Sequence, residues 1–244
     1  MKRALTVVIS ALVVLVGAVV IWFYTSTNIE DPVEVTAPPV TEATETTVAT
    51  STGTGDDPTG DSGQTGTTDS VFQLTDASTV TFQLDEVLRG SPVTVVATNS
   101  EVAAQIALDP SDLSSTQIGT VVIGAQTFET DSSSRNRAIR GPILDSQGFP
   151  TITFAPTLID GLSGSAGVGE LLEFTVTGDL TIRDVTRSVA FAVSASLRDE
   201  ATIEGTAEST VSREDFGLSI PSVPSVADVS DEVLLKIEFV ASAG

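Results

Sequence analysis

The side chains best suited to binding an anion are concentrated in one short segment of the chain. Arg135, Arg137 and Arg140 follow one another closely in a sequence that is otherwise strongly acidic. Guanidinium groups make strong, paired hydrogen bonds to phosphate and carboxylate oxygens. The segment is therefore a candidate site for an anionic headgroup. The alternative is that these arginines form ion pairs with the many carboxylates around them, which an acidic surface offers widely.

Side chains that commonly perform catalysis are scarce. The chain contains no histidine and no cysteine, and its only lysines are Lys2 and Lys236. Histidine is the usual general base, and cysteine and activated lysine are common nucleophiles. Carboxylate pairs carry out acid–base work in some hydrolases, but no spacing in this sequence singles out such a pair. We predict that the protein is not an enzyme, and we assign it no catalytic residue, no metal ligand and no cofactor.

The charge balance argues against a further class of partner. The net charge is −22, from 33 acidic and 11 basic residues. Proteins that bind nucleic acid do so largely through Lys and Arg contacts to phosphates, so we expect no nucleic-acid partner. The absence of cysteine also excludes disulfides and thiolate metal sites.

The arginine segment is expected to form a short helix over residues 132–140. The serines at its start are good N-capping residues, and few strand-forming residues follow them. Gly141 and Pro142 come next and are expected to end the helix. A short helix or turn would then lie over one end of the surrounding structure.

Most of the chain after residue 71 has the pattern of β-strands. Apolar and polar residues alternate from Phe174 to Ile182 and again from Val185 to Val193, which predicts a hairpin with a turn at Arg183 and Asp184. Gly178 lies on the apolar face of this hairpin and is expected to leave space there. Further short strands are predicted between turn residues at 72–74, 80–84, 93–98, 102–108, 116–128, 151–154, 201–212 and 232–241. This succession predicts an all-β sandwich or barrel.

The N-terminal region predicts a membrane anchor and a linker. Residues 4–24 are almost continuously apolar and follow Lys2 and Arg3, which predicts one transmembrane helix with a cytoplasmic N-terminus. A cleaved signal peptide is the alternative, although the apolar run is long for one. Residues 25–70 are rich in Thr, Glu, Asp, Gly and Pro and are expected to be disordered. The predicted organisation is an anchor at 1–24, a linker at 25–70 and a globular domain at 71–244.

Four motifs in this domain resemble those of the YceI-like, polyisoprenoid-binding family. They are residues 134–139 with 149–154 (SRNRAI and FPTITF), 178–187 (GDLTIRDVTR), 212–218 (SREDFGL) and 229–237 (VSDEVLLKI). Two positions depart from the family pattern: Asn136 stands where the family usually has Asp, and Asp184 where its hairpin turn usually has Gly. The four motifs occur in the order typical of the family.

The resemblance implies an extended antiparallel, lipocalin-like β-barrel with a short helix and an apolar pore for a long lipid chain. A barrel of this size can hold one small ligand. On this interpretation the apolar face of the hairpin and two nearby phenylalanines are candidate lipid-binding residues. They are Phe82, Phe154, Phe174, Val176, Leu180, Val189, Phe191 and Val193. The alternative is that these side chains form a packed β core.

Two functions are compatible with this picture. The first is a lipid-binding protein, anchored in the cell membrane with its domain outside the cytoplasm, that carries or stores a polyisoprenoid or fatty chain. The second is a structural or stress-related surface domain without a small ligand. The two share every sequence feature named above.

Overall fold

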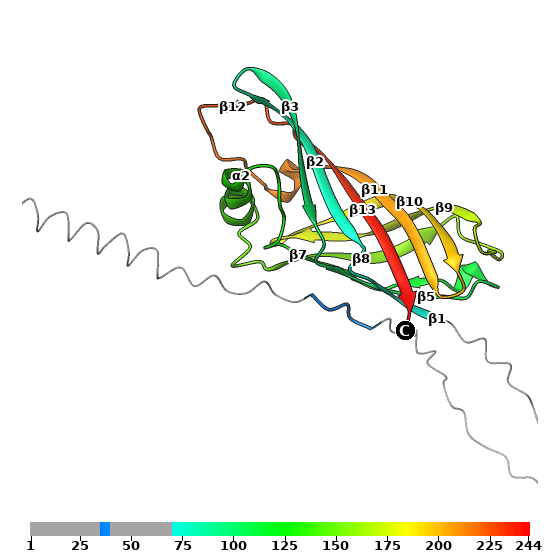
Figure 1. Ribbon diagram of the computed structural model, residues 1–244. Coiled ribbons are helices and arrows are strands. Elements are labelled where there is room, and N and C mark those ends of the chain that lie inside the picture. Colours follow the sequence, from blue (N-terminus) through cyan, green and yellow to red (C-terminus); the bar gives the residue numbers. More distant parts are fainter. Residues whose placement is uncertain (1–34, 40–69) are drawn as a thin grey trace, which may run out of the picture. The chain divides into compact units, whose positions relative to one another are not determined.

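The computed structural model describes residues 35–39 and 70–244 (Figure 1). The expected membrane span at 1–24 lies outside the described residues, and so does the expected linker at 25–70 apart from residues 35–39 and Ser70. No helix within the described ranges is long and apolar enough to cross a membrane. Residues 35–39 form neither helix nor strand.

Between residues 70 and 244 the chain is almost entirely β-structure. The strands are β1 (Ser70–Leu74), β2 (Thr79–Leu88), β3 (Ser91–Asn99), β4 (Val102–Ala103), β5 (Gln105–Leu108), β6 (Gln117–Ile118), β7 (Val121–Gly124), β8 (Thr151–Asp160), β9 (Leu171–Ile182), β10 (Val185–Asp199), β11 (Thr202–Ser212), β12 (Val226–Ala227) and β13 (Glu232–Ala243). Helix α2 (Ser133–Ala138) continues into a wider π turn (Ile139–Ile143), and 3₁₀ turns lie at Leu113–Ser115 and Glu214–Phe216. The predicted all-β class with one short helix is confirmed.

The strands form one antiparallel sheet that curls into a half-barrel. Its order is β4-β7-β8-β9-β10-β11-β13-β1-β5-β6, and β2 pairs with β13, β3 and β12 beside this path. The strands at the two ends of the order are consecutive in the chain, because residues 102–108 supply β4 and β5 while residues 117–124 supply β6 and β7. Val102 pairs with Ile123, and Ile106 pairs with Ile118. One face of the curled sheet is therefore turned inward along its whole length.

Three strand predictions differ from the structure. The strand expected over residues 102–108 is divided at Ala104 into β4, which pairs with β7, and β5, which pairs with β1. The single strand expected over residues 116–128 is wrong: β6 and β7 are separated, and the backbone N–H of Gly119 between them donates to the Gln105 carbonyl. The strand expected at 151–154 extends to Asp160 in β8, with a register shift between Pro156 and Leu158. Proline has no N–H to donate to a ladder and is tolerated in strands at such irregularities.

The hairpin predicted around Arg183 and Asp184 is confirmed. Ile182 of β9 pairs with Val185 of β10, so the connection has two residues. Arg183 has φ 57°, which places it in the left-handed region that tight hairpin turns use. This turn sets the register of the two strands and hence which of their side chains face inward.

The helix differs at its C-terminal end from the sequence prediction. The Ser132 side chain caps α2 by accepting from the Arg135 N–H, as expected of an N-capping serine. Gly141 and Pro142, however, do not end the helical segment but lie inside the π turn, which is closed by the Leu144 N–H donating to the Ile139 carbonyl. The prediction that they stop the helix is wrong: the helical segment continues through both residues to Ile143, because the fixed φ of proline is compatible with a helical backbone.

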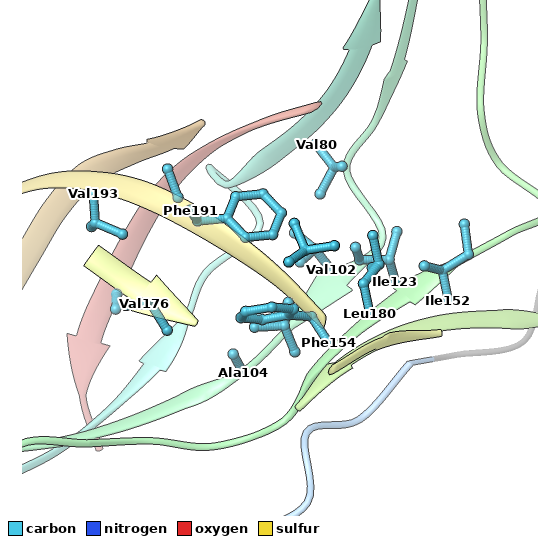
Figure 2. Close-up of a cluster of buried hydrophobic side chains, with 14 of the residues drawn as sticks. Val80, Val102, Ala104, Ile123, Ile152, Phe154, Val176, Leu180, Phe191 and Val193 are labelled. Carbon is cyan, nitrogen blue, oxygen red and sulfur yellow. The ribbon is translucent and has the colours of Figure 1, made fainter. Parts of the chain in front are cut away.

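Inward-facing apolar side chains pack against one another inside the curled sheet. Along β10, buried residues alternate with exposed ones from Val189 to Leu197, so one face of the strand is apolar and enclosed. Figure 2 shows part of this cluster, with the rings of Phe154 and Phe191 between Val176 and Val193 on one side and Leu180 on the other. The core is one continuous cluster that runs from the helix-bearing end of the sheet past the Phe pair and includes Val193, Leu197 and Leu113.

Candidate functional site

An apolar cavity lies inside the curled sheet. The volume of the cavity is about 110 Å³. Its lining is Leu74, Ala104, Ile106, Leu108, Leu113, Thr116, Ile118, Val121, Phe154, Leu162, Leu172, Phe174, Val176, Phe191, Val193, Ala195, Ile203, Ala207, Ile237 and Phe239. A lining of this composition cannot hold a metal ion or polarise a reacting bond, but it can solvate a hydrocarbon group.

The cavity occupies one half of the sheet's length. On the β9–β10 pair its lining includes Leu172 and Ala195, which are register partners, whereas the turn end of the same pair is Ile182 and Val185. Two loops add Leu113 and the half-buried Leu162 to the lining. We call the segments 109–116, 160–173 and 198–201 the loop end, and the region of α2, the π turn and the 183–184 turn the helix end.

Five of the eight residues selected from the sequence line this cavity. They are Phe154, Phe174, Val176, Phe191 and Val193. Leu180 and Val189 are buried in the core towards the helix end, and neither lines the cavity. Phe82 on β2 packs against Phe128 instead, with ring centroids 5.3 Å apart.

The Phe154–Phe191 pair separates the cavity from the packed core. The two rings meet edge to face, with centroids 5.0 Å apart and an interplanar angle of 70°, an arrangement that aromatic quadrupoles favour. Val176 and Val193 lie on the cavity side of the rings, and Leu180, Ile123 and Ile152 lie on the other side (Figure 2). We call this pair the floor of the cavity.

Two glycines let phenylalanine rings lie against the sheet backbone. A Cβ placed on Gly178 would be 2.7 Å from Cζ of Phe154 and 2.5 Å from the Ala155 carbonyl oxygen. A Cβ on Gly205 would be 2.7 Å from Cζ of Phe239, its register partner on β13. The expectation that Gly178 leaves free space is therefore wrong, because the Phe154 ring fills that space.

The loop end is closed by hydrogen bonds between its two longer loops. The backbone N–H of Leu113 donates to the Gly164 carbonyl at 2.8 Å, and that of Ala166 donates to the Pro110 carbonyl at 2.9 Å. Gly161, Gly164 and Gly169 all have positive φ, which side chains rarely adopt. The 161–170 loop is thus shaped by glycine, and it is also attached to β10, because the Gly169 N–H donates to the Leu197 carbonyl.

Thr116 is the one polar residue among the lining side chains. Its Oγ1 atom is buried and has no hydrogen-bond partner in the described part of the chain. Most buried hydroxyls in proteins are paired, so an unpaired one is unusual. It lies beside the Leu113–Ser115 turn, at the loop end of the cavity.

The three arginines selected from the sequence lie at the helix end, away from the cavity lining. Arg135 forms ion pairs with the buried Glu86 of β2 at 3.0 Å and with Asp131. Arg140 lies 3.8 Å from Glu129 and donates to the Phe128 carbonyl. Arg137 is exposed and has no such partner among the described residues.

A fourth arginine, Arg213 of the 212–218 motif, donates hydrogen bonds to the backbone of neighbouring loops. The mostly buried Arg213 side chain donates to the carbonyls of Ser230 and Leu218. The Asp231 carboxylate accepts from the Glu214 N–H, and hydrogen bonding from the Ser212 hydroxyl lowers the pKa of Asp231 below its ordinary value. These contacts fix the loop that precedes β12 and β13, so the motif preserves backbone geometry.

Several lining residues were not selected from the sequence. Ile237 and Phe239 alternate on β13 and gave a usable signal, because both face the same side of a strand. Leu113 and Leu162 lie in loops, where no periodicity marks them. Their place in the lining depends on the long-range contacts between the two loops.

Comparisons with known proteins identify the fold. A polyisoprenoid binding domain from Saccharophagus degradans, implicated in plant cell wall breakdown, has 13% identity and a TM-score of 0.58, covering 72% of this chain and 99% of its own. BcnA from Burkholderia cenocepacia has 22% identity and a TM-score of 0.54, covering 69% of this chain and 99% of its own. The YCEI protein of Campylobacter jejuni has 18% identity and a TM-score of 0.50, and the match covers 61% of this chain and 84% of that protein. No curated protein matches the chain.

The family model of the YceI-like domain matches residues 73–241. This range runs from β1 to β13 and includes every strand that lines the cavity. The chain therefore belongs to the YceI-like domain family.

Proposed function

We propose that this protein binds the hydrocarbon chain of a lipid, a polyisoprenoid or a fatty chain, in the cavity above the Phe154–Phe191 floor. The observation that supports this proposal is the apolar lining of the cavity. Inward-facing side chains such as Leu172, Phe174 and Phe239 are only partly buried although they point into the sheet. Burying such surface against a hydrocarbon is favourable by about 25 cal/mol per Å².

The likeness to the Saccharophagus degradans domain supports this proposal, since that protein is described as polyisoprenoid-binding. The absence of histidine and cysteine from the chain favours binding over catalysis. We infer a carrier or a reservoir.

The small volume of the cavity limits the length of the apolar group that it can hold. Its 110 Å³ is on the scale of engineered apolar cavities of about 150 Å³ that bind benzene, so it takes only a short apolar group without rearrangement. A longer chain requires the loops joined by the Leu113–Gly164 and Ala166–Pro110 hydrogen bonds to open. The small volume also favours the second candidate, a surface domain that carries no small ligand.

We further propose that the domain is tethered to the cell membrane and lies outside the cytoplasm. The apolar run at 4–24, preceded by Lys2 and Arg3, supports a single span with a cytoplasmic N-terminus. The acidic stretch that follows supplies a linker long enough for the domain to reach the bilayer.

Mass spectrometry of organic extracts tests the binding proposal. The full chain is purified as wild type, as Val176→Trp and as Val96→Trp, and the bound lipid is quantified per protein. Val176 is 3% exposed and lines the cavity, whereas Val96 is 42% exposed. Val96→Trp therefore controls for the added indole ring.

We expect Val176→Trp to lose most of the bound lipid and Val96→Trp to retain it. A folded Val176→Trp with only a small loss of thermal stability indicates that the ring occupies ligand space. A wild type without lipid, together with a Val176→Trp that loses about 1–3 kcal/mol through overpacking, rejects the carrier and leaves the structural domain.

A further inference from the structure

The arginine segment and the cavity lie at opposite ends of the curled sheet. Helix α2 lies in the connection between Gly124 and Thr151, which are register partners on β7 and β8. The cavity lining at Leu172 and the turn at Ile182 are ten residues apart along β9, which corresponds to roughly 30 Å at the rise of an extended strand. Figure 1 shows α2 at one end of the sheet and the free ends of β9 and β5 towards the other.

The interior does not connect the two ends. Beyond the Phe154–Phe191 floor, the core is filled by buried side chains that include Leu180, Ile182 and Val189. A chain held above the floor therefore cannot extend to the arginines. Its polar headgroup must leave the cavity at the loop end, between the loops that contribute Leu113 and Leu162.

The loop end is acidic. Its carboxylates are Asp109, Asp112, Asp160, Glu170, Glu173, Asp199 and Glu200. Arg198 is the one basic residue in these segments, and it is paired with Glu204. The Ser111 hydroxyl donates to Asp109 and lowers the pKa of that carboxyl, so Asp109 remains ionised at neutral pH. A headgroup at this end thus meets a negative potential.

We propose that the ligand enters tail first through the loop end and carries an uncharged headgroup, such as an alcohol, a ketone or an amide. This inference rests on the proposed lipid-binding function and adds the orientation and the ligand class. An anionic lipid, such as a prenyl diphosphate or a fatty acid, would place its charge beside the carboxylates. The repulsion between one pair of like charges is weak in water, but the repulsions from several carboxylates add together.

Two probes of equal chain length test the headgroup. Hexadecanol and hexadecanesulfonate are offered to the full-length protein, and the bound amount of each is measured at low and at high ionic strength. We expect hexadecanol to bind on the order of fivefold more tightly at low ionic strength. The ratio should narrow as salt shortens the Debye length to about 3 Å at 1 M.

Charge variants at each end locate the headgroup. The double variant Asp160→Lys/Glu173→Lys reverses two exposed carboxylates at the loop end. It should strengthen sulfonate binding several-fold and leave hexadecanol unchanged. Arg137→Glu reverses one charge at the helix end, where Arg137 is exposed and unpaired within the described residues. It should alter the binding of neither probe.

The outcomes separate this inference from the proposed function. If neither probe binds to the wild type, lipid binding itself is rejected. If both bind and the sulfonate is equal or tighter, the uncharged-headgroup inference is overturned while lipid binding stands. If Arg137→Glu weakens the sulfonate and the loop-end variant has no effect, the headgroup lies at the helix end and the inferred orientation is overturned.

Discussion

The ring of Phe154 lies against the backbone of Gly178, so closely that a Cβ at residue 178 would be 2.7 Å from the Phe154 Cζ atom. The two residues lie on neighbouring strands, where Pro156 pairs with Gly178 and Phe154 pairs with Leu180. The absence of a side chain at Gly178 therefore lets the Phe154 ring lie against the backbone of β9.

Replacing this glycine should destabilise the domain. In Gly178→Ala the new methyl meets the Ala155 carbonyl oxygen at 2.5 Å, and a backbone atom cannot move aside cheaply. We expect a loss of about 1–3 kcal/mol in the free energy of unfolding, measured by denaturant titration. Gly141→Ala is the control, because a Cβ there meets nothing within 4 Å. Equal stability of the two variants would contradict the close contact.

Replacing Phe154 by a smaller residue should allow the cavity to hold a longer lipid chain. Phe154→Leu removes the ring that meets Phe191 and opens space towards Leu180. We expect lipids extracted from this variant to shift towards longer chains, as read by mass spectrometry. Phe128→Leu removes a similarly buried ring that does not line the cavity. It should lose stability without changing chain length, and a shift in both variants would show a general loosening of the core.

The unpaired hydroxyl of Thr116 should be dispensable for stability. Thr116→Val replaces a buried hydroxyl without a partner by a methyl of similar shape. No hydrogen bond is lost, so we expect the free energy of unfolding to stay the same or to rise by up to about 1 kcal/mol. Thr127→Val is the comparison, because the Thr127 hydroxyl lies within hydrogen-bond distance of two acceptors, Asn99 Oδ1 at 2.8 Å and Glu101 Oε2 at 3.0 Å, and donates to one of them. It should be destabilised by about 1 kcal/mol or more. A destabilised Thr116→Val would reveal a partner for its hydroxyl.

Asp231 should contribute to stability in a pH-dependent way. The pKa of Asp231 is below its ordinary value of 3.8, mainly because the Ser212 hydroxyl donates a hydrogen bond to the carboxylate. The Glu214 N–H and the positive charge of Arg213 lower this pKa further. A lowered pKa in the folded state stabilises the protein above the unfolded pKa, and this contribution is lost as the pH falls through the folded pKa.

The stability difference between wild type and Asp231→Asn should therefore be largest above about pH 4 and shrink towards pH 2. Denaturant titrations across this range measure it. Glu200→Gln, at an exposed loop position, controls for loss of a surface charge. A difference that stays constant down to pH 2 would remove the ionised carboxylate as its cause.

The proposed topology predicts the outcome of proteolysis on intact cells. Protease added from outside should cut within residues 25–70 and release a fragment containing the β-domain. The domain itself should resist cleavage, because its strands are hydrogen-bonded throughout the sheet. Protection of the whole chain until the membrane is broken would reverse the orientation.

Most strands, and the side of the sheet that their residues face, could be predicted from the order of the amino acids. Alternation from Phe174 to Val193 identified a hairpin, its turn at Arg183 and Asp184, and four side chains that line the cavity. These are local properties, because the period of two along a strand decides which side chains share a face. The motif resemblance likewise predicted the family that the match over residues 73–241 established.

The positions along the sheet at which the interior is filled or open could be found only from the folded chain. Leu180 and Val176 lie on the same face of β9, yet Leu180 is packed in the core and Val176 lines the cavity. The difference comes from Phe154, which reaches Gly178 from the neighbouring strand. Leu113 and Leu162 join the lining because two loops about 50 residues apart in sequence are hydrogen-bonded to each other. Periodicity along one strand carries no information about such contacts between distant segments, so the position of the cavity and its distance from the arginines required the folded chain.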